Sequence, residues 1–205
     1  MNTLDIEKFW NWFSDNSKAL QPDSPDETIL AELDRRVLVF NEALSWEVGP
    51  GSQKQFEFTI SPSGQKELMQ TTKAIIAKAP KLEYWEFYPA KPCKAWSPCF
   101  NFIGAEGGEL SVDATKWDYS LAKYEDDTFD IAVRITGCEA FSEDDKLTAV
   151  EIMLDGILGE IERIEKISSI NVTNMFTPDL QNKSNSIAVL KEHWKSLVGA
   201  HEAKV

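Results

Sequence analysis

Cysteine is scarce in this sequence, which has three thiols, Cys93, Cys99 and Cys138. A chain of 205 residues can bury enough surface to fold without disulfide staples, so an odd number of cysteines fits a reducing compartment. There is no Cys-x-x-Cys pair, and Cys93 and Cys99 have no second pair nearby, which excludes the usual spacing of redox and structural zinc sites. We therefore predict buried thiols, no disulfide and no metal site.

Histidine is scarcer still, because only His193 and His201 are present, both near the C-terminus. Nucleophilic catalysis usually pairs Ser or Cys with a histidine base. The chain also lacks a Gly-x-Ser-x-Gly elbow, a Walker phosphate loop and a Gly-x-Gly-x-x-Gly turn after a strand. We predict that His193 lies on a helix surface and that no cofactor is bound. These absences make an enzyme the less favoured interpretation, but they do not decide whether the protein is one.

Long apolar runs are missing as well. The segment Met1–Glu7 lacks the basic start and apolar run of a signal peptide. No later stretch approaches the roughly 20 apolar residues that a helix needs to span a bilayer. We therefore predict a cytoplasmic protein that does not contact a membrane.

Positive charge is in short supply, because 21 basic residues face 34 acidic ones and the net charge is -13. Such a balance repels phosphate backbones and anionic lipids, so we predict no nucleic-acid partner. A basic protein surface is the better partner hypothesis, although acidity also simply promotes solubility. Charge alone identifies no partner, and the sequence leaves the oligomeric state open.

What the sequence does contain is typical of a globular protein, with 42% hydrophobic and 27% charged residues. Its patterns predict an α+β fold with a mainly antiparallel mixed sheet and helices packed on it. We predict a single compact domain over residues 1–205. The one internal boundary is an irregular stretch rich in Pro and Gly at 89–108, which would join halves 1–92 and 108–205.

Helical periodicity marks both ends of the chain. An aromatic stripe predicts the first helix: Ile6, Phe9, Trp10 and Phe13. Ser24-Pro25-Asp26-Glu27 then combines an N-cap serine, proline at the first helical position and glutamate at N3, and an apolar stripe continues to Leu44. These two helices form a predicted N-terminal hairpin. An amphipathic helix from Ile187 to Val198 closes the chain.

Between the ends, the pattern alternates between strands and helices. A β-hairpin at 45–61, a helix at 68–79 and a strand at 82–88 precede the irregular stretch. Beyond an edge strand at 100–103 and a glycine-rich turn at 104–108, strands follow at 110–114, 117–124 and 129–136. Ser142 caps the longest predicted helix, which continues to Ile164, and a strand follows at 167–172.

Residues 46–88 and 117–172 share the order strand, strand, helix, strand. Two local similarities accompany that order: Trp46-Glu47 against Trp117-Asp118, and Phe56-Glu57 against Phe129-Asp130. One hypothesis is a duplicated unit, and the other is two unrelated halves of one mixed sheet.

Carboxylates are the remaining candidates for chemistry, because acid and base roles can be divided between two acids in different environments. Glu47, Glu86 and Asp118 each adjoin a tryptophan on a predicted strand, where a large apolar neighbour could raise the carboxyl pKa. The alternative is that each acid is the solvent-facing partner of a core residue in an alternating strand.

Tryptophan is abundant, with seven residues in the chain. Trp10 and Trp12 cannot share one helical face, so we predict that one of them is exposed or covers an interface. Trp85 adjoins Glu86, and Trp96 lies in the irregular stretch, where loops tend to carry function. The predicted binding residues are Glu47, Trp85, Glu86, Trp96 and Asp118.

The sequence does not determine the function, and three hypotheses remain. The first is a cytosolic protein–protein interaction module of the inhibitor or immunity type, which presents an acidic surface with aromatic anchors. The alternative is a small-molecule-binding protein or enzyme that uses Glu47, Glu86 and Asp118 in an aromatic cleft. A scaffolding role within an oligomer is the third.

Overall fold

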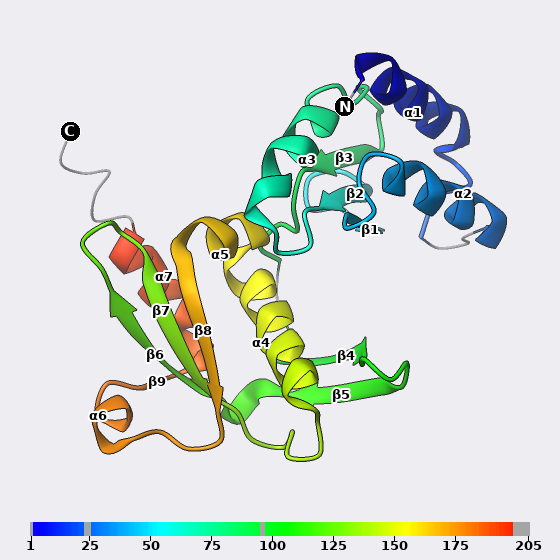
Figure 1. Cartoon of the computed structure of the whole chain (residues 1–205). Helices are drawn as coiled ribbons and strands as arrows, with labels where there is room; N and C mark the ends of the chain where they lie inside the picture. The colour runs from blue at the N-terminus through cyan, green and yellow to red at the C-terminus, as the bar shows by residue number, and fades with distance from the viewer. Residues whose placement is uncertain (1, 23–25, 95–96, 199–205) are drawn as a thin grey trace. The chain divides into compact units, whose positions relative to one another are not determined.

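The computed structural model describes residues 2–22, 26–94 and 97–198 (Figure 1). It confirms the α+β class, with helices near both ends of the chain. The chain divides into two compact units, Met1–Lys91 and Pro92–Val205. Whether these units form one domain stays a prediction, and each is described by itself. Ser24, Pro25 and Trp96 lie outside the described residues.

The first unit contains a three-stranded sheet and its helices. In chain order the elements are α1 (Thr3–Asn16), α2 (Glu27–Leu38), β1 (Ser45–Pro50), β2 (Phe56–Ser61), η1 (Lys66–Leu68), α3 (Met69–Ile76) and β3 (Trp85–Tyr88). The sheet order is β1-β2-β3, with β1 antiparallel and β3 parallel to β2. A parallel neighbour requires a crossover, which α3 supplies.

Helix α2 begins later and ends earlier than the sequence predicts. Its N-cap is Asp26 rather than Ser24, because the Asp26 carboxylate accepts the N–H groups of Thr28 and Ile29 at 2.9 and 3.2 Å. The helix stops at Leu38, before the end of the predicted stripe at Leu44. A polar side chain that forms a hydrogen bond with nearby backbone competes with helix formation. The Asn41 side chain accepts the N–H of Ala43 at 2.9 Å, which favours a turn over continuation of the helix.

The apolar face of this sheet forms the core of the first unit. Seven side chains share it: Trp46, Val48, Phe56, Phe58, Ile60, Trp85 and Phe87. Helix α1 packs there, with the ring centroids of Phe13 and Phe58 4.9 Å apart. The indole N–H of Trp10 donates to the Ile75 carbonyl at 2.8 Å, which ties α1 to α3. Trp12 is half-buried, packs against this core and lies under the Arg36 guanidinium, which is 4.7 Å from the Trp12 ring centroid.

The second unit contains two sheets. Its elements are β4 (Cys99–Ile103), β5 (Glu109–Asp113), η2 (Ala114–Lys116), β6 (Asp118–Lys123), β7 (Phe129–Arg134), α4 (Glu143–Leu158), α5 (Glu160–Lys166), β8 (Ile167–Thr173), α6 (Pro178–Gln181), β9 (Asn185–Ser186), η3 (Ile187–Val189) and α7 (Leu190–Val198). Strands β4 and β5 form an antiparallel hairpin, and the other sheet has the order β8-β7-β6-β9. The strands β4 to β8 lie close to the predicted positions, whereas the short strand β9 was not predicted.

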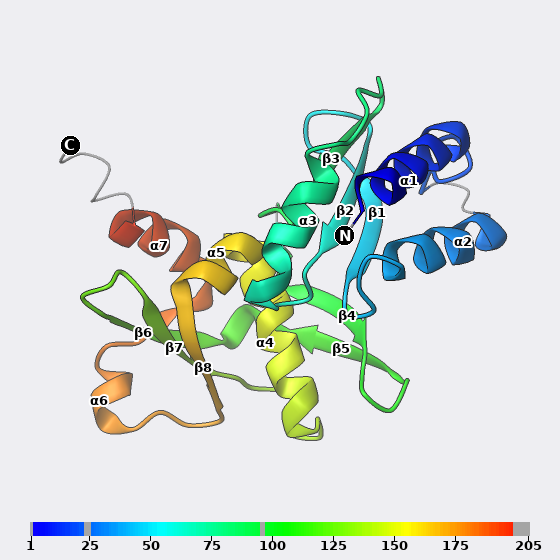
Figure 2. The ribbon, with the colours of Figure 1, turned by 45° about the horizontal axis from the view of Figure 1, so that its top comes forward.

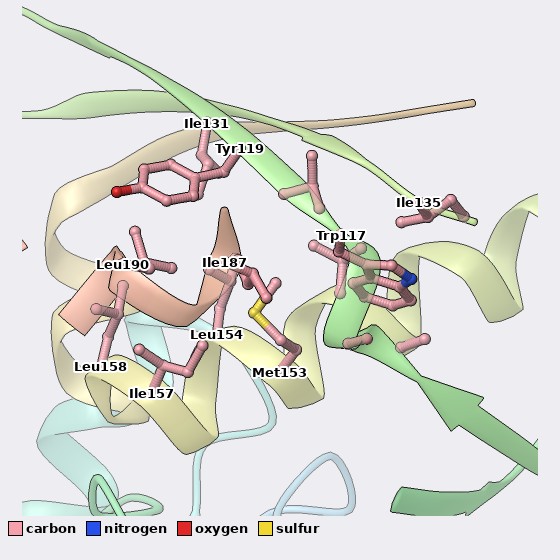
Figure 3. Close-up of a cluster of buried hydrophobic side chains, with 14 of the residues drawn as sticks. Trp117, Tyr119, Ile131, Ile135, Met153, Leu154, Ile157, Leu158, Ile187 and Leu190 are labelled. Atoms are coloured by element: carbon pink, nitrogen blue, oxygen red, sulfur yellow. The ribbon is translucent and has the colours of Figure 1, made fainter. Parts of the chain in front are cut away.

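Figure 3 shows the core of the second unit. Strand residues such as Tyr119 and Ile131 face Leu154 on α4 and Leu190 on α7. All four side chains are at most 1% exposed. The predicted C-terminal helix therefore completes this core rather than lying apart from it.

Helix α4 is shorter than predicted. Ser142 is its N-cap, as expected, and accepts the N–H of Asp145 at 3.1 Å. The helix ends at Leu158, because Gly159 adopts φ +89° and ψ 146°, a conformation that essentially only glycine tolerates. A separate helix, α5, begins at Glu160. The apolar periodicity continues across Gly159, which is why it predicts one helix.

Both units repeat one topology, a β-hairpin followed by a helical crossover to a parallel strand. The registers match, since Phe56 pairs with Pro50 and Phe129 pairs with Lys123 at equivalent hairpin ends. Phe56 and Phe129 are therefore equivalent, as the sequence similarity indicates. Asp118, however, corresponds to Ser45 rather than Glu47. The similarity between Trp46-Glu47 and Trp117-Asp118 therefore does not align equivalent positions of the two hairpins. A duplication event stays a prediction.

Candidate functional site

Two of the three predicted carboxylates lie on the same face of the first sheet. Cross-strand neighbours share a face, and Glu47 is opposite Thr59 while Glu57 is opposite Glu86. The polar face consists of Ser45, Glu47, Glu57, Thr59, Ser61, Glu86 and Tyr88. It lies opposite the aromatic core, so the tryptophans beside Glu47 and Glu86 point away from these acids.

Glu57 is the buried acid of this face, and it is not among the residues predicted from the sequence. Its side chain is 2% exposed, and Thr59 and Ser61 beside it are fully buried. Strand β2 is central, and all six of its residues are buried. The alternating pattern of β2 predicts that Glu57 faces solvent. The signal that could have identified Glu57 as buried is the position of β2 between two flanking strands.

Glu86 anchors the β1–β2 turn. Its carboxylate accepts the backbone N–H of Ser52, the Ser52 hydroxyl at 3.2 Å and the N–H of Gln53 at 3.1 Å. Desolvation acts to raise the pKa of Glu86, but the donors of Ser52 and Gln53 outweigh it and the pKa is lowered. The expectation of a raised pKa is therefore wrong at this position.

We expect Glu86→Gln to remove a pH-dependent restraint on the turn. A lowered folded-state pKa means that ionised Glu86 stabilises the turn above the unfolded pKa of about 4.3, and that this stabilisation is lost as pH falls through the folded pKa. In the wild type, the amide NMR signals of Ser52 and Gln53 should shift together below about pH 4.3. In the variant they should not.

Glu83→Gln is the matched control for this titration. Glu83 is exposed and lies on the same connection into β3, so its replacement should leave the titration of the turn amides unchanged. A midpoint above the ordinary glutamate pKa in the wild type would contradict the assignment of Glu86 as a charged anchor.

The other predicted residues that the structure describes, Asp118 and Trp85, are not part of this face. Asp118 lies in the second unit, where it forms an ion pair with Arg134 across β6 and β7. Arg134 also lies 5.8 Å from the Phe176 ring centroid. Trp85 is 3% exposed and packs between Phe13 and Phe56 in the core. Trp96 lies outside the described residues. No observation thus favours a shared cleft of Glu47, Glu86 and Asp118.

His193 is not a simple surface residue. It is half-buried on α7, with its Nδ1 2.7 Å from the Tyr119 hydroxyl on β6. Desolvation raises the pKa of Tyr119 to about 12, so its hydroxyl stays protonated. Because Tyr119 is fully buried, this pair ties α7 to the sheet and offers no accessible nucleophile.

The thiols differ from the prediction in part. Cys138 is buried, as expected, but Cys93 and Cys99 are exposed. Desolvation and the nearby Asp113 carboxylate raise the pKa of Cys99, which disfavours the reactive thiolate. Within residues 2–22, 26–94 and 97–198, no three His, Cys, Asp or Glu side chains are grouped to hold a metal ion. No helix in these ranges is long and apolar enough to cross a membrane.

The β4–β5 hairpin has an exposed outer face, and it extends away from the four-stranded sheet (Figures 1 and 2). Phe100, Phe102 and Val112 face inward and pack on the core. The outer face consists of Cys99, Asn101, Ile103, Glu109, Ser111 and Asp113, all exposed. Ile103 is 67% exposed, so its apolar side chain is available for contact on this face.

The tip of the hairpin is fastened to the start of α4. The Asp145 carboxylate accepts the N–H of Ala105 at 2.8 Å and the Ser142 hydroxyl at 2.7 Å. These donors, Ser142 first, lower the pKa of Asp145, so it stays charged. A Cβ at Gly104 would come within 2.7 Å of Leu110 Cδ1, so a larger residue there would force the Leu110 side chain to move.

The hairpin is uniformly acidic. Residues 99–113 include Glu106, Glu109 and Asp113 but no Lys or Arg. Hydrogen bonds from Thr115 lower the pKa of Asp113. Glu143 and Asp144 add negative charge in the first turn of α4. We name Ile103, Glu106, Glu109 and Asp113 the acidic hairpin patch. It carries an exposed apolar side chain among carboxylates.

Comparisons of the chain with protein-family models, curated proteins and solved structures gave no match. Any inference about function therefore depends on the geometry and charge of the molecule.

Proposed function

We propose that this protein is a protein–protein interaction module of the inhibitor or immunity type, and that its acidic hairpin patch binds a basic protein surface in the cytoplasm. The observation that carries the proposal is the exposure of Ile103, 67%, on a hairpin whose charged residues are all acidic. Three free cysteines support the reducing location.

The patch has the anatomy of a binding surface. Interfaces bury apolar anchors at their centre and place charge at the rim, which sets partner choice and association rate. Ile103 supplies an anchor, and Glu106, Glu109 and Asp113 supply a rim of a single sign. Among the described residues, the β4–β5 sheet has two strands. Each strand therefore keeps an unpaired edge to which a strand of the partner can be added.

Charge reversal on the hairpin tests the proposal. Glu106→Lys combined with Glu109→Lys should reduce capture of a basic partner from lysate by about tenfold, since like charges at an interface oppose association. The measurement is affinity capture with the tagged protein at low and high salt, followed by mass spectrometry. Asp113 is left in place because it caps η2 by accepting the N–H of Thr115 at 3.0 Å.

The control makes the same change in net charge on the first unit. Glu42→Lys combined with Glu83→Lys replaces two exposed acids outside the patch and should leave capture unchanged. Salt should release the wild-type partner, because exposed charges are screened. Equal capture by both double variants, or a partner indifferent to salt, would refute the role of the patch.

A further inference from the structure

A groove between α4 and α7 in the second unit lies outside the acidic hairpin patch. Two cavities of about 440 Å³ each meet there, and both are lined by Ile157 and Lys191. One continues toward Ile187 on η3 and the other toward Trp194 on α7. We name the two cavities together the α4–α7 groove. Its size falls in the range of small-molecule sites, roughly 300–1,000 Å³.

The floor of the groove is apolar. Ile157, Leu158, Ile187 and Trp194 line it and are each at most 8% exposed, so they are held by the core beneath. The indole N–H of Trp194 donates to Glu162 at 3.2 Å, which fixes the ring. A floor of this kind stabilises a ligand with an apolar body.

The rim of the groove is cationic, which is the reverse of the protein as a whole. Among the described residues, Lys94, Lys191 and Lys195 line it against one acid, Glu162. Lys195 is paired with Glu192 at 3.0 Å. The Lys191 ammonium has no ion pair or hydrogen bond in the described part of the chain. In a chain with 34 acidic and 21 basic residues, three lysines at one groove mark a place for an anion.

We propose that the α4–α7 groove binds a small amphiphilic carboxylate, with its apolar body along the floor from Ile187 past Ile157 to Trp194 and its carboxylate on Lys191. A carboxylate suits a single unpaired ammonium, which forms a charge-assisted hydrogen bond. Phosphate-rich ligands are disfavoured by the strongly negative net charge of -13. This site lies outside the acidic hairpin patch and does not depend on its proposed role.

Decanoate is the probe that tests this site, and its cationic counterpart is decyltrimethylammonium. Isothermal titration calorimetry below the micellar range measures affinity, and the indole NMR signal of Trp194 reports the location, since Trp194 lines the groove. We expect decanoate to bind at least tenfold more tightly than decyltrimethylammonium and to shift the Trp194 signal.

Two variants test the rim and the space separately. Lys191→Gln removes the cation and should lower the affinity for decanoate about tenfold, which is the contribution of about one hydrogen bond to a charged group. Ala188→Trp fills the groove from an exposed position and should weaken decanoate by at least tenfold. Lys183→Gln, an exposed lysine that does not line the groove, is the matched control and should change nothing.

The proposal is overturned if wild-type protein does not bind decanoate, if the two probes bind equally, or if Lys191→Gln and Lys183→Gln behave alike. Unchanged affinity in Ala188→Trp, with circular dichroism showing an intact fold, would also overturn it. Partner capture through the acidic hairpin patch should be the same in Ala188→Trp as in the wild type. The failure of one proposal is therefore distinguishable from the failure of the other.

Discussion

Replacing Arg163 by methionine should lower the free energy of unfolding by about 3–5 kcal/mol, the usual effect of breaking a buried ion pair from one side. The Arg163 guanidinium is 8% exposed and binds both carboxylate oxygens of Asp155, itself 5% exposed. It also donates to Glu151 at 3.2 Å. Removing it leaves buried negative charge without its nearest compensation.

The measurement is urea unfolding of wild type and Arg163→Met. Lys166→Met is the control, because it removes a cation from the same short helix, at a position that forms no ion pair in the described residues, and should cost under about 0.5 kcal/mol. Combining Asp155→Asn with Arg163→Met should recover part of the loss, since neighbouring changes are not additive. A loss below about 1 kcal/mol in Arg163→Met would contradict the buried pair.

Replacing Phe58 by alanine should cost about 3–5 kcal/mol, because deleting a fully buried aromatic ring removes its transfer free energy and leaves a cavity. Phe58 lies on the central strand of the first sheet. Its ring centroid is 4.9 Å from that of Phe13 and 6.2 Å from that of Trp10. The ring therefore joins the sheet to α1, and its loss weakens both.

Urea unfolding and near-ultraviolet circular dichroism measure this effect. Tyr84→Ala is the control, since Tyr84 is 52% exposed in the same unit and should change stability by less than about 0.5 kcal/mol. If Phe58→Ala and Tyr84→Ala had similar small effects, Phe58 would not be a core residue of the first unit.

Much of the fold is predictable from the sequence, because hairpins and helices are encoded by local periodicity. The hairpin at 45–61 and the strands β6 and β7 lie where alternation places them. The errors fall where one local interaction overrides the pattern. Gly159 ends α4 within a continuing apolar stripe, and Asp26 caps α2.

The break at Gly159 also makes possible a contact that no pattern predicts. In a continuous helix, Asp155 and Arg163 would lie about 12 Å apart along the axis, at about 1.5 Å per residue. Because α5 starts in a new direction, Arg163 returns to Asp155 with an N–O distance of 2.5 Å. This buried ion pair of the second unit therefore depends on the turn.

The candidate site was less predictable than the fold. The sequence predicts the edge strand at 100–103 and the turn at 104–108, but not that Ile103 is exposed among acids. It selects Glu86 and Asp118 because each adjoins a tryptophan. In the structure Glu86 accepts hydrogen bonds from Ser52 and Gln53, and Asp118 forms an ion pair with Arg134.

Local sequence was enough to establish the α+β class, most of the order of strands and helices and the acidic character, because composition and periodicity are properties of neighbouring residues. Tertiary packing, in contrast, determines which carboxylates are neutralised, which are buried and which are exposed. Glu86, Asp118 and Asp155 gain their partners from residues distant in the chain or beyond a helix break, and such pairings depend on the path of the backbone in space. The groove lined by Lys191 likewise exists only where α4 and α7 meet.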